Sequence, residues 1–354
     1  MRLAEPHTHF ERPPASDAVE PPEAHGLPRD GVKLMIARPG AIVHGRFADL
    51  GEHLDPGDLL VVNNSATLPA AVDAVRGAGP IAVHFSTALD DHVWVVEPRP
   101  AINASAHLPD VEPGERIALP DGAALVVIAS YPEPGVAGSR LWTSRLAIEG
   151  DVTSYLGRHG RPIRYGYVPR SWPLSSYQTV FARRPGSAEM ASAARPFSTA
   201  LVTALVSAGF AIAPITLHAG VSSAEPGEPP VAEHFDVPPA TARLVNLTRA
   251  SGGRVVAVGT TATRALESAA DSDGIVRAAR GWTDLVLGPD RPPRVVDGLI
   301  TGWHDAGASH LLLLEAVAGP ALVAVAYREA IGNGYLWHEF GDSALLLPTP
   351  RRSR

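Results

Sequence analysis

Short, continuous apolar runs alternate with amphipathic stretches along most of the chain, a pattern typical of folds that mix strands and helices. Residues 59–62 and 255–258 are aliphatic runs of the kind found in buried strands. Residues 198–207, 239–250 and 320–331 place apolar side chains at helical spacing and begin at a serine or proline suited to a helix start. We therefore expect an α/β (α+β) fold.

The pattern changes from about residue 72 to residue 150. Short alternating runs at 81–86, 93–97, 124–129 and 141–148 are separated there by clusters of Gly, Pro and Asp. This spacing predicts a small all-β module without a helix of its own. We expect residues 66–150 to form an inserted domain, and residues 1–65 and 151–354 to form one discontinuous catalytic domain.

The stretch from residue 254 to residue 268 is the most informative one in the chain. Its strand ends at Gly259, which lets the backbone turn, and Thr260 or Thr261 can cap the helix that follows. A strand that feeds a helix in this way points unpaired N–H groups at one spot, which suits an anion. Arg264 lies in the first helical turn and opposes the macrodipole, so we expect it to have a negative partner. Glu267 is an equally good partner by spacing.

Length and composition narrow the class of protein. The 354 residues suggest two domains, and 45% hydrophobic with 19% charged residues is ordinary for a globular enzyme. The absence of Cys excludes disulfides, cysteine nucleophiles and thiolate metal sites. The sequence has neither a signal-peptide pattern nor an apolar run of ~18 residues, so a cytoplasmic protein is expected. His7 and His9 have metal-ligand spacing, but a solvated tail is favoured and no metal is expected.

Charge is unevenly distributed. The net charge of −7 weighs against a nucleic-acid partner. Residues 156–200, however, hold seven arginines, six aromatic residues and one acid, Glu189. Arginine neutralises phosphates and aromatic rings stack on unpaired bases, so this stretch predicts RNA contact; a surface loop in an arginine-rich protein is the alternative. The arginines expected to bind RNA are Arg161, Arg164, Arg170, Arg183 and Arg184.

Several segments resemble one family. Residues 259–268, GTTATRALES, resemble the GTT-x-x-R-x-LES segment of the S-adenosylmethionine:tRNA ribosyltransferase-isomerases of queuosine biosynthesis. Residues 56–64 resemble PGDLLVxNN, and residues 177–181 resemble YQTVY. Further likenesses follow in the family's order up to Leu347. They are residues 216–220 to TLHVG, 233–238 to the end of HSE-x-F-x-VP, 296–301 to the start of VDxLITNFH and 335–346 to YRFFSYGDAMLI.

The resemblance implies a fold and a reaction. It implies a barrel-like mixed main domain that carries a small antiparallel β-barrel. It also implies transfer and isomerisation of the ribosyl group of S-adenosylmethionine onto a 7-aminomethyl-7-deazaguanine in tRNA, with release of adenine and methionine. S-adenosylmethionine would be a co-substrate, tRNA the partner, and neither a prosthetic group nor a metal would be needed.

Candidate site residues follow from the matched motifs. A sulfonium acidifies the neighbouring ribosyl CH₂, so the reaction needs a base, for which the candidates are His218, His304 and Glu233 in that order. A buried core histidine and a loop histidine are the alternatives for His218 and His304. We expect the two histidines to roof a cavity floored by the backbone after Val258.

The remaining candidates would bind substrate. Gly259, Thr260, Thr261 and Arg264 are expected to hold a carboxylate or phosphate, and Arg264→Ala is expected to weaken binding without harming the fold. Hydroxyls or base edges would be read by Asn63, Asn64 and Asp342. The matched motifs add Tyr177, Gln178 and Thr301.

The chain also departs from the family's motifs. Ala66 and Ala71 replace two arginines, Arg195-Pro196 replaces the histidine region of PTAGLHF, and the histidines before Glu233 are absent. Three hypotheses stay open: the tRNA enzyme itself, a divergent S-adenosylmethionine-dependent ribosyl transferase with a non-tRNA acceptor, and a non-catalytic RNA- or nucleoside-binding relative. A dinucleotide-binding oxidoreductase is a weaker rival, because the spaced glycines are missing.

Overall fold

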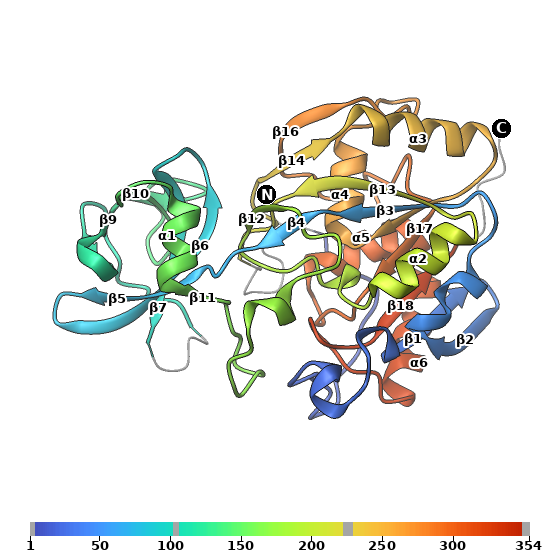
Figure 1. Cartoon of the computed structure of the whole chain (residues 1–354), viewed down its shortest axis with the longest axis horizontal. Helices are drawn as coiled ribbons and strands as arrows, with labels where there is room; N and C mark the ends of the chain where they lie inside the picture. The colour runs from blue at the N-terminus through green and yellow to red at the C-terminus, as the bar shows by residue number, and fades with distance from the viewer. Residues whose placement is uncertain (1–3, 102–105, 222–228, 349–354) are drawn as a thin grey trace.

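The computed structural model describes residues 4–101, 106–221 and 229–348, and its largest element is a nine-stranded mixed sheet (Figure 1). Strands β13, β3, β15 and β17 run parallel at its centre. In sheet order, the strands are β16 (Ala279–Thr283), β14 (Glu233–Val237), β13 (Ala211–Leu217), β3 (Leu59–Asn63), β15 (Val255–Val258), β17 (Gly298–Thr301), β18 (Ser343–Leu346), β1 (Lys33–Arg38) and β2 (Ala41–Arg46). The two aliphatic runs expected to be buried strands thus lie side by side as β3 and β15.

Alternation along β3 divides its side chains between two cores. Leu59 and Val61 face one core, while Leu60 and Val62 face the other. One face is covered by α3 (Pro239–Ala250), α4 (Thr260–Ser268), α5 (Ser309–Ala318) and α6 (Pro320–Gly332). The opposite face is covered by α2 (Thr199–Ser207) and the 3₁₀ segment Phe47–His53. Burial on both faces explains why these strands are aliphatic throughout.

A second sheet closes into a six-stranded antiparallel barrel, seen on the left of Figure 1. The barrel closes where β5 pairs with β8, at Val75 and Ala118. Its strands are β5 (Ala71–Arg76), β6 (Gly79–Ala88), β7 (Val93–Pro100), β10 (Leu141–Ala147), β9 (Ala124–Tyr131) and β8 (Arg116–Ala118), and β11 (Gly160–Arg161) pairs alongside β5. The predicted class, an α/β fold with an antiparallel β-barrel inserted in it, is confirmed.

No α-helix lies within the described residues of 72–150, as the sequence predicts, but a helix that follows them packs against the barrel. Helix α1 (Val152–His159) contributes Val152, Tyr155 and Leu156 to the barrel core. The sequence pattern missed this because the helix follows the last alternating run and completes the core from the end of the module. We propose that the inserted unit extends beyond residue 150, to about Ile163, which packs in the same core.

The N-terminal segment is docked, which corrects the expected solvated tail. Thr8 is buried and donates from both its backbone N and its Oγ1 to Glu315 of α5, each at 2.7 Å. His7 also contacts Glu315, and Asp17 forms a bridge to Trp337. In the described part of the chain, no group of three or more His, Cys, Asp or Glu is arranged to hold a metal ion.

Helix starts follow the sequence only in part. Ser198 caps α2 as expected, accepting from the N–H of Leu201 at 3.0 Å. Helix α5 begins at Ser309, but the N-cap is Ala308 and no side chain caps it. Within the described ranges no single helix is long and apolar enough to cross a membrane, although α5 and α6 together pass that test with a bend of 117°.

Two glycines near the end of α1 provide a test of the barrel packing. A Cβ added at Gly160 would overlap the carbonyl oxygen of Pro69 and approach that of Leu156 at 2.7 Å, whereas nothing lies within 4 Å of one added at Gly157. Gly160→Ala should therefore destabilise the protein by about 1–3 kcal/mol. Gly157→Ala should be neutral or stabilising by up to ~1 kcal/mol, because alanine favours the helix. Thermal unfolding compares the two variants, and equal midpoints would contradict this packing.

Candidate active site

The turn from β15 to α4 is built on Gly259. Its φ of 94° lies in the region that favours glycine, and it forms the N-cap of α4 without a side-chain cap. The sequence predicts a cap at Thr260 or Thr261. Neither side chain caps the helix, because Gly259 occupies the N-cap position. The first N–H groups of α4 have no partner within the helix. They lie where Gly259, Thr260 and Thr261 line a cavity.

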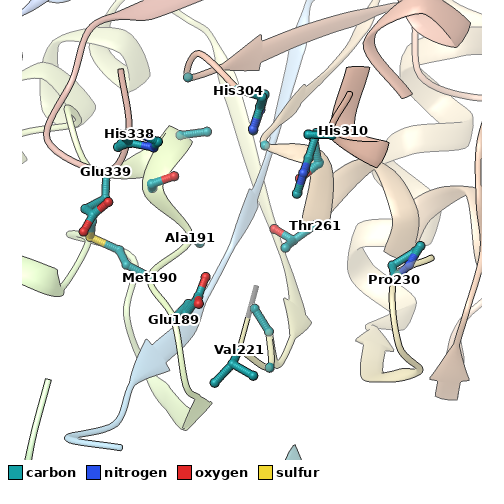
Figure 2. A pocket seen from close by; sticks show the side chains of 18 of the residues that line it. Glu189, Met190, Ala191, Val221, Pro230, Thr261, His304, His310, His338 and Glu339 are labelled. Atoms are coloured by element: carbon teal, nitrogen blue, oxygen red, sulfur yellow. The ribbon is translucent and has the colours of Figure 1, made fainter. Parts of the chain in front are cut away.

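This cavity has a volume of about 700 Å³ and lies between the main sheet and the barrel. On the main-sheet side its wall includes the start of α4, residues 188–193 and the loop from Thr301 to His310. Residues 162–163, 165–167 and 338–339 line it as well, and the barrel contributes Arg99 and Arg140. Figure 2 shows His304, His310 and Thr261 facing the same space. The cavity therefore brings together segments that are far apart in the sequence.

Arg264 has its negative partner inside the protein. Its guanidinium forms a short ion pair with Glu233 of β14 and also donates to the carbonyl oxygens of Leu285 and Thr283 at 3.1 and 3.0 Å. Burial raises the pKa of Glu233, and Arg264 opposes that rise. Glu267 is not the partner, because it accepts instead from the backbone N–H groups of residues 294–296. Arg264 therefore shapes the cavity wall rather than offering a free cation.

Glu233 is correspondingly poorly placed as a base. One carboxylate oxygen is held by Arg264 and the other accepts from the N–H of Gly220 at 3.1 Å. Proton abstraction would require this carboxylate to leave both partners. The placement favours a structural role for Glu233.

His218 does not line the cavity. Its Nδ1 lies 2.8 Å from Ser65 Oγ, and its ring stacks on His234 with centroids 6.1 Å apart. A Cβ added at Gly186 would approach the same Nδ1 at 2.5 Å, so the imidazole is packed beneath that glycine. Burial and the neighbouring His234 lower its pKa to about 4. His218 was expected to form part of the cavity roof, and in the structure it does not.

His304 does line the cavity, and it stacks on a second histidine. The rings of His304 and His310 are parallel within 1°, with centroids 4.4 Å apart (Figure 2). Thr301 Oγ1 donates to the carbonyl of Gly302 at 3.1 Å and lies 3.0 Å from His304 Nε2. The threonine therefore accepts from Nε2–H, which assigns the proton to Nε2 and leaves Nδ1 as the acceptor.

Both histidines are neutral at neutral pH. Burial and the adjacent His310 and His338 place the pKa of His304 well below its usual value. Burial and Arg264 lower the pKa of His310 to about 4. His310, in the first turn of α5, was not among the residues predicted from the sequence. The available signal was an imidazole in the first turn of that helix, six residues after His304.

Three of the polar candidates form hydrogen bonds to neighbouring strands and loops around the site. Asn63 is buried; its Nδ2 donates to Leu217 O at 2.8 Å and its Oδ1 accepts from the N–H groups of Leu217 and Ser65. Asn64 accepts from Thr216 Oγ1 at 2.7 Å. Asp342 accepts from the N–H groups of Lys33 and Leu336. These oxygen atoms all accept hydrogen bonds within the protein, so we expect the three residues to position strands rather than read a ligand.

Tyr177 and Gln178 are neighbours in the sequence, but only Tyr177 lines the cavity. Gln178 bonds the backbone of Thr67 through both its oxygen and its nitrogen, at 3.0 and 2.7 Å. Tyr177 and Thr301 line the cavity. The Tyr177 hydroxyl is buried and has no hydrogen-bond partner among the described residues. Tyr177 is thus the residue of the YQTVY-like segment that borders the cavity.

The arginines expected to bind RNA lie at or near the surface. Arg161 pairs with Asp73, Arg184 pairs with Asp236, and Arg170 pairs with Glu20 while lying over the ring of Trp172. Arg164 donates to two backbone carbonyls, and Arg183 is exposed. Surface ion pairs are weak and exchangeable, so these pairs leave the arginines able to contact phosphates. RNA binding by this group stays a prediction.

Comparisons with known proteins agree along almost the whole chain. A family model described as queuosine biosynthesis protein matches residues 7–346. The chain is 36% identical to the S-adenosylmethionine:tRNA ribosyltransferase-isomerase of Symbiobacterium thermophilum over 332 residues, which cover 90% of this chain and 94% of that protein. It is 34% identical to the protein of the same name from Moorella thermoacetica, covering 98% of this chain and 100% of the relative.

A solved structure is also similar. The crystal structure of an S-adenosylmethionine tRNA ribosyltransferase from Thermotoga maritima matches with a TM-score of 0.51 and 27% identity. The match covers 96% of this chain and 99% of that chain. Glu228, which takes the place of one of the histidines before Glu233, lies outside the described residues.

The ion pair between Arg264 and Glu233 gives a stability prediction that corrects the sequence-based one. Arg264→Ala leaves a buried carboxylate without its partner, so we expect a loss of about 3–5 kcal/mol of unfolding free energy rather than an intact fold. The double variant Arg264→Ala/Glu233→Ala removes the orphaned charge and should be less destabilised than the sum of the two single variants. Denaturant unfolding of all three measures this coupling. Additive losses would mean that the pair is not coupled.

Proposed function

The chain belongs to the queuosine biosynthesis protein family, and from this membership we infer that it is an S-adenosylmethionine:tRNA ribosyltransferase-isomerase. The observation that carries this inference is the match over residues 7–346, with relatives of that name aligned over nearly their full length. The enzyme transfers and isomerises the ribosyl group of S-adenosylmethionine onto 7-aminomethyl-7-deazaguanine in tRNA. No observation favours a non-tRNA acceptor or a non-catalytic role.

We propose His304 as the base that removes a proton from the ribosyl CH₂ beside the sulfonium. The hydrogen bonds of Thr301 assign the proton to Nε2 and leave Nδ1 as the acceptor, and the ring borders the cavity. The lowered pKa of His304 and His310 keeps both rings neutral at neutral pH. Neutral rings can accept a proton, and they do not repel a sulfonium cation. His310 lies flat against His304 and supports its orientation.

We propose that the start of α4 holds the carboxylate of the methionyl group or a phosphate. The amides after Gly259 lie on the cavity wall, and a helix N-terminus attracts anions. Arg264 adds little net charge there, because Glu233 neutralises it. The exposed arginines of residues 161–184 would contact tRNA outside the cavity. Since tRNA is the partner, we propose the cytoplasm as the location of the protein.

Release of adenine tests the reaction directly. The protein is incubated with S-adenosylmethionine, with and without a precursor tRNA that carries 7-aminomethyl-7-deazaguanine, and free adenine is measured. We expect release only when tRNA is present. His304→Asn should slow release by about 10²- to 10⁴-fold, the usual contribution of a general base.

The exposed variant Glu52→Gln on the 3₁₀ segment Phe47–His53 is the control and should react like the wild type. Release without tRNA would favour a different acceptor. No release under either condition would favour a non-catalytic relative. Full activity of His304→Asn would reject His304 as the base and leave the family assignment standing.

The acid limb of the pH profile gives a further prediction. A base works in its unprotonated form, so the rate falls when the pH drops through its pKa. Because burial and the neighbouring His310 and His338 lower the pKa of His304, kcat/KM should stay level from pH 8 to well below pH 6.5. Initial rates in buffers of constant ionic strength measure this profile. A midpoint at or above pH 6.5 would contradict an assignment to this buried imidazole.

A further inference from the structure

One side of the cavity is acidic and aromatic. Figure 2 shows His338 and Glu339 across the cavity from Thr261 and His310. We call this side the acidic wall. It consists of Tyr165, Tyr167, Tyr177, Glu189, His338 and Glu339, all of which line the cavity.

Glu339 presents a carboxylate on this wall that forms no ion pair with any described residue. Its carboxylate accepts from Tyr167 Oη at 2.5 Å and is half-buried. No arginine, lysine or histidine of the described residues lies within 4.0 Å of it. A carboxylate with one hydrogen bond and no ion pair can accept further donors, so the site suits a ligand that brings a positive charge or N–H donors.

Tyr177 offers an independent sign of a missing ligand. Its side chain is 5% exposed, its hydroxyl lacks a partner among the described residues, and it borders the cavity. Burial and the charge of Glu339 raise its pKa to about 12, so the hydroxyl keeps its proton. A buried hydroxyl without a hydrogen bond is unusual and costs free energy unless a ligand satisfies it.

The same wall presents stacked rings. Tyr167 stacks between Tyr165, with centroids 6.0 Å apart, and His338, with centroids 4.0 Å apart. Tyr165 in turn donates to Glu189. His338 adopts a φ of 71°, which is uncommon for a residue other than glycine and costs free energy. The protein therefore holds this imidazole in place against a backbone preference, and a row of π faces borders the acidic groups.

Two residues of the acidic wall differ from the family motif that this part of the chain resembles. Residues 335–346 resemble YRFFSYGDAMLI, and in that alignment His338 and Glu339 replace phenylalanine and serine. Both replacements add polar groups to the cavity. Glu339 places a carboxylate where the motif has a serine hydroxyl.

We infer that the acidic wall is the binding site for a planar base that carries a positive charge and a donor-rich edge. The inference rests on the proposed function, in which the acceptor, 7-aminomethyl-7-deazaguanine, has an ammonium group and guanine-type N–H donors. Its ring would stack on the tyrosines, its donors would bond Glu339 and Glu189, and Tyr177 would donate to a ring acceptor. S-adenosylmethionine would occupy the opposite side, with its carboxylate at α4 and its ribosyl CH₂ near His304.

Glu339→Gln and Tyr177→Phe test this assignment in the full-length protein. Calorimetry measures binding of free 7-aminomethyl-7-deazaguanine, with guanine as the ligand that lacks the ammonium group. Glu339→Gln should weaken binding of the aminomethyl base by about tenfold or more, and that of guanine by less. Tyr177→Phe should weaken both, by a smaller factor. The exposed Glu52→Gln should change neither, and thermal unfolding checks that each variant is folded.

Kinetics separate this assignment from the proposed function. In the adenine-release reaction, Glu339→Gln should raise the KM for precursor tRNA and leave the KM for S-adenosylmethionine within about twofold. A rise in the KM for S-adenosylmethionine alone would reassign the wall to that substrate and overturn the inference. So would wild-type binding of the free base that neither variant weakens, or no binding at all. A wild type that binds the base through Glu339 but releases no adenine would support the acidic wall and refute the proposed function.

Discussion

The buried ion pair between Arg264 and Glu233 sets the shape of the active site. It joins α4 to β14, and the same guanidinium holds the backbone at Thr283 and Leu285. Because the two charges neutralise each other, the wall beside α4 keeps only the partial positive charge of the helix N-terminus. A cationic sulfonium can approach such a wall, whereas an unpaired arginine would repel it.

The cavity is electrostatically divided as a result. One side has helix amides and neutral imidazoles, and the other has carboxylates and tyrosines. S-adenosylmethionine has a carboxylate at one end and a sulfonium near its reacting carbon, while the acceptor base brings an amine. On the proposed function, the two substrates would therefore prefer different sides, and their reacting groups would meet between Thr261 and Glu339. The barrel closes the space from a third direction through Arg99 and Arg140.

Much of the fold was predictable because it depends on local patterns. The strand at 255–258 and the helix after Gly259 follow directly from an aliphatic run and a glycine. The partners of the side chains were harder to predict from the sequence, because each partner lies far along the chain. Arg264 pairs with Glu233, 31 residues away, rather than with Glu267, and His218 turns toward Ser65 instead of the cavity. Glu339 faces the cavity only because a distant loop brings it there, and nothing in its local sequence indicates this.

A crystal structure with S-adenosylmethionine bound would test the central claim most directly, namely that the cavity at the start of α4 is where this substrate reacts. We expect the methionyl carboxylate at the amides of Thr260 and Thr261, and the ribosyl CH₂ beside Nδ1 of His304. The acidic wall should remain open for the acceptor. S-adenosylmethionine bound near His218, or with its carboxylate directed away from α4, would contradict the account.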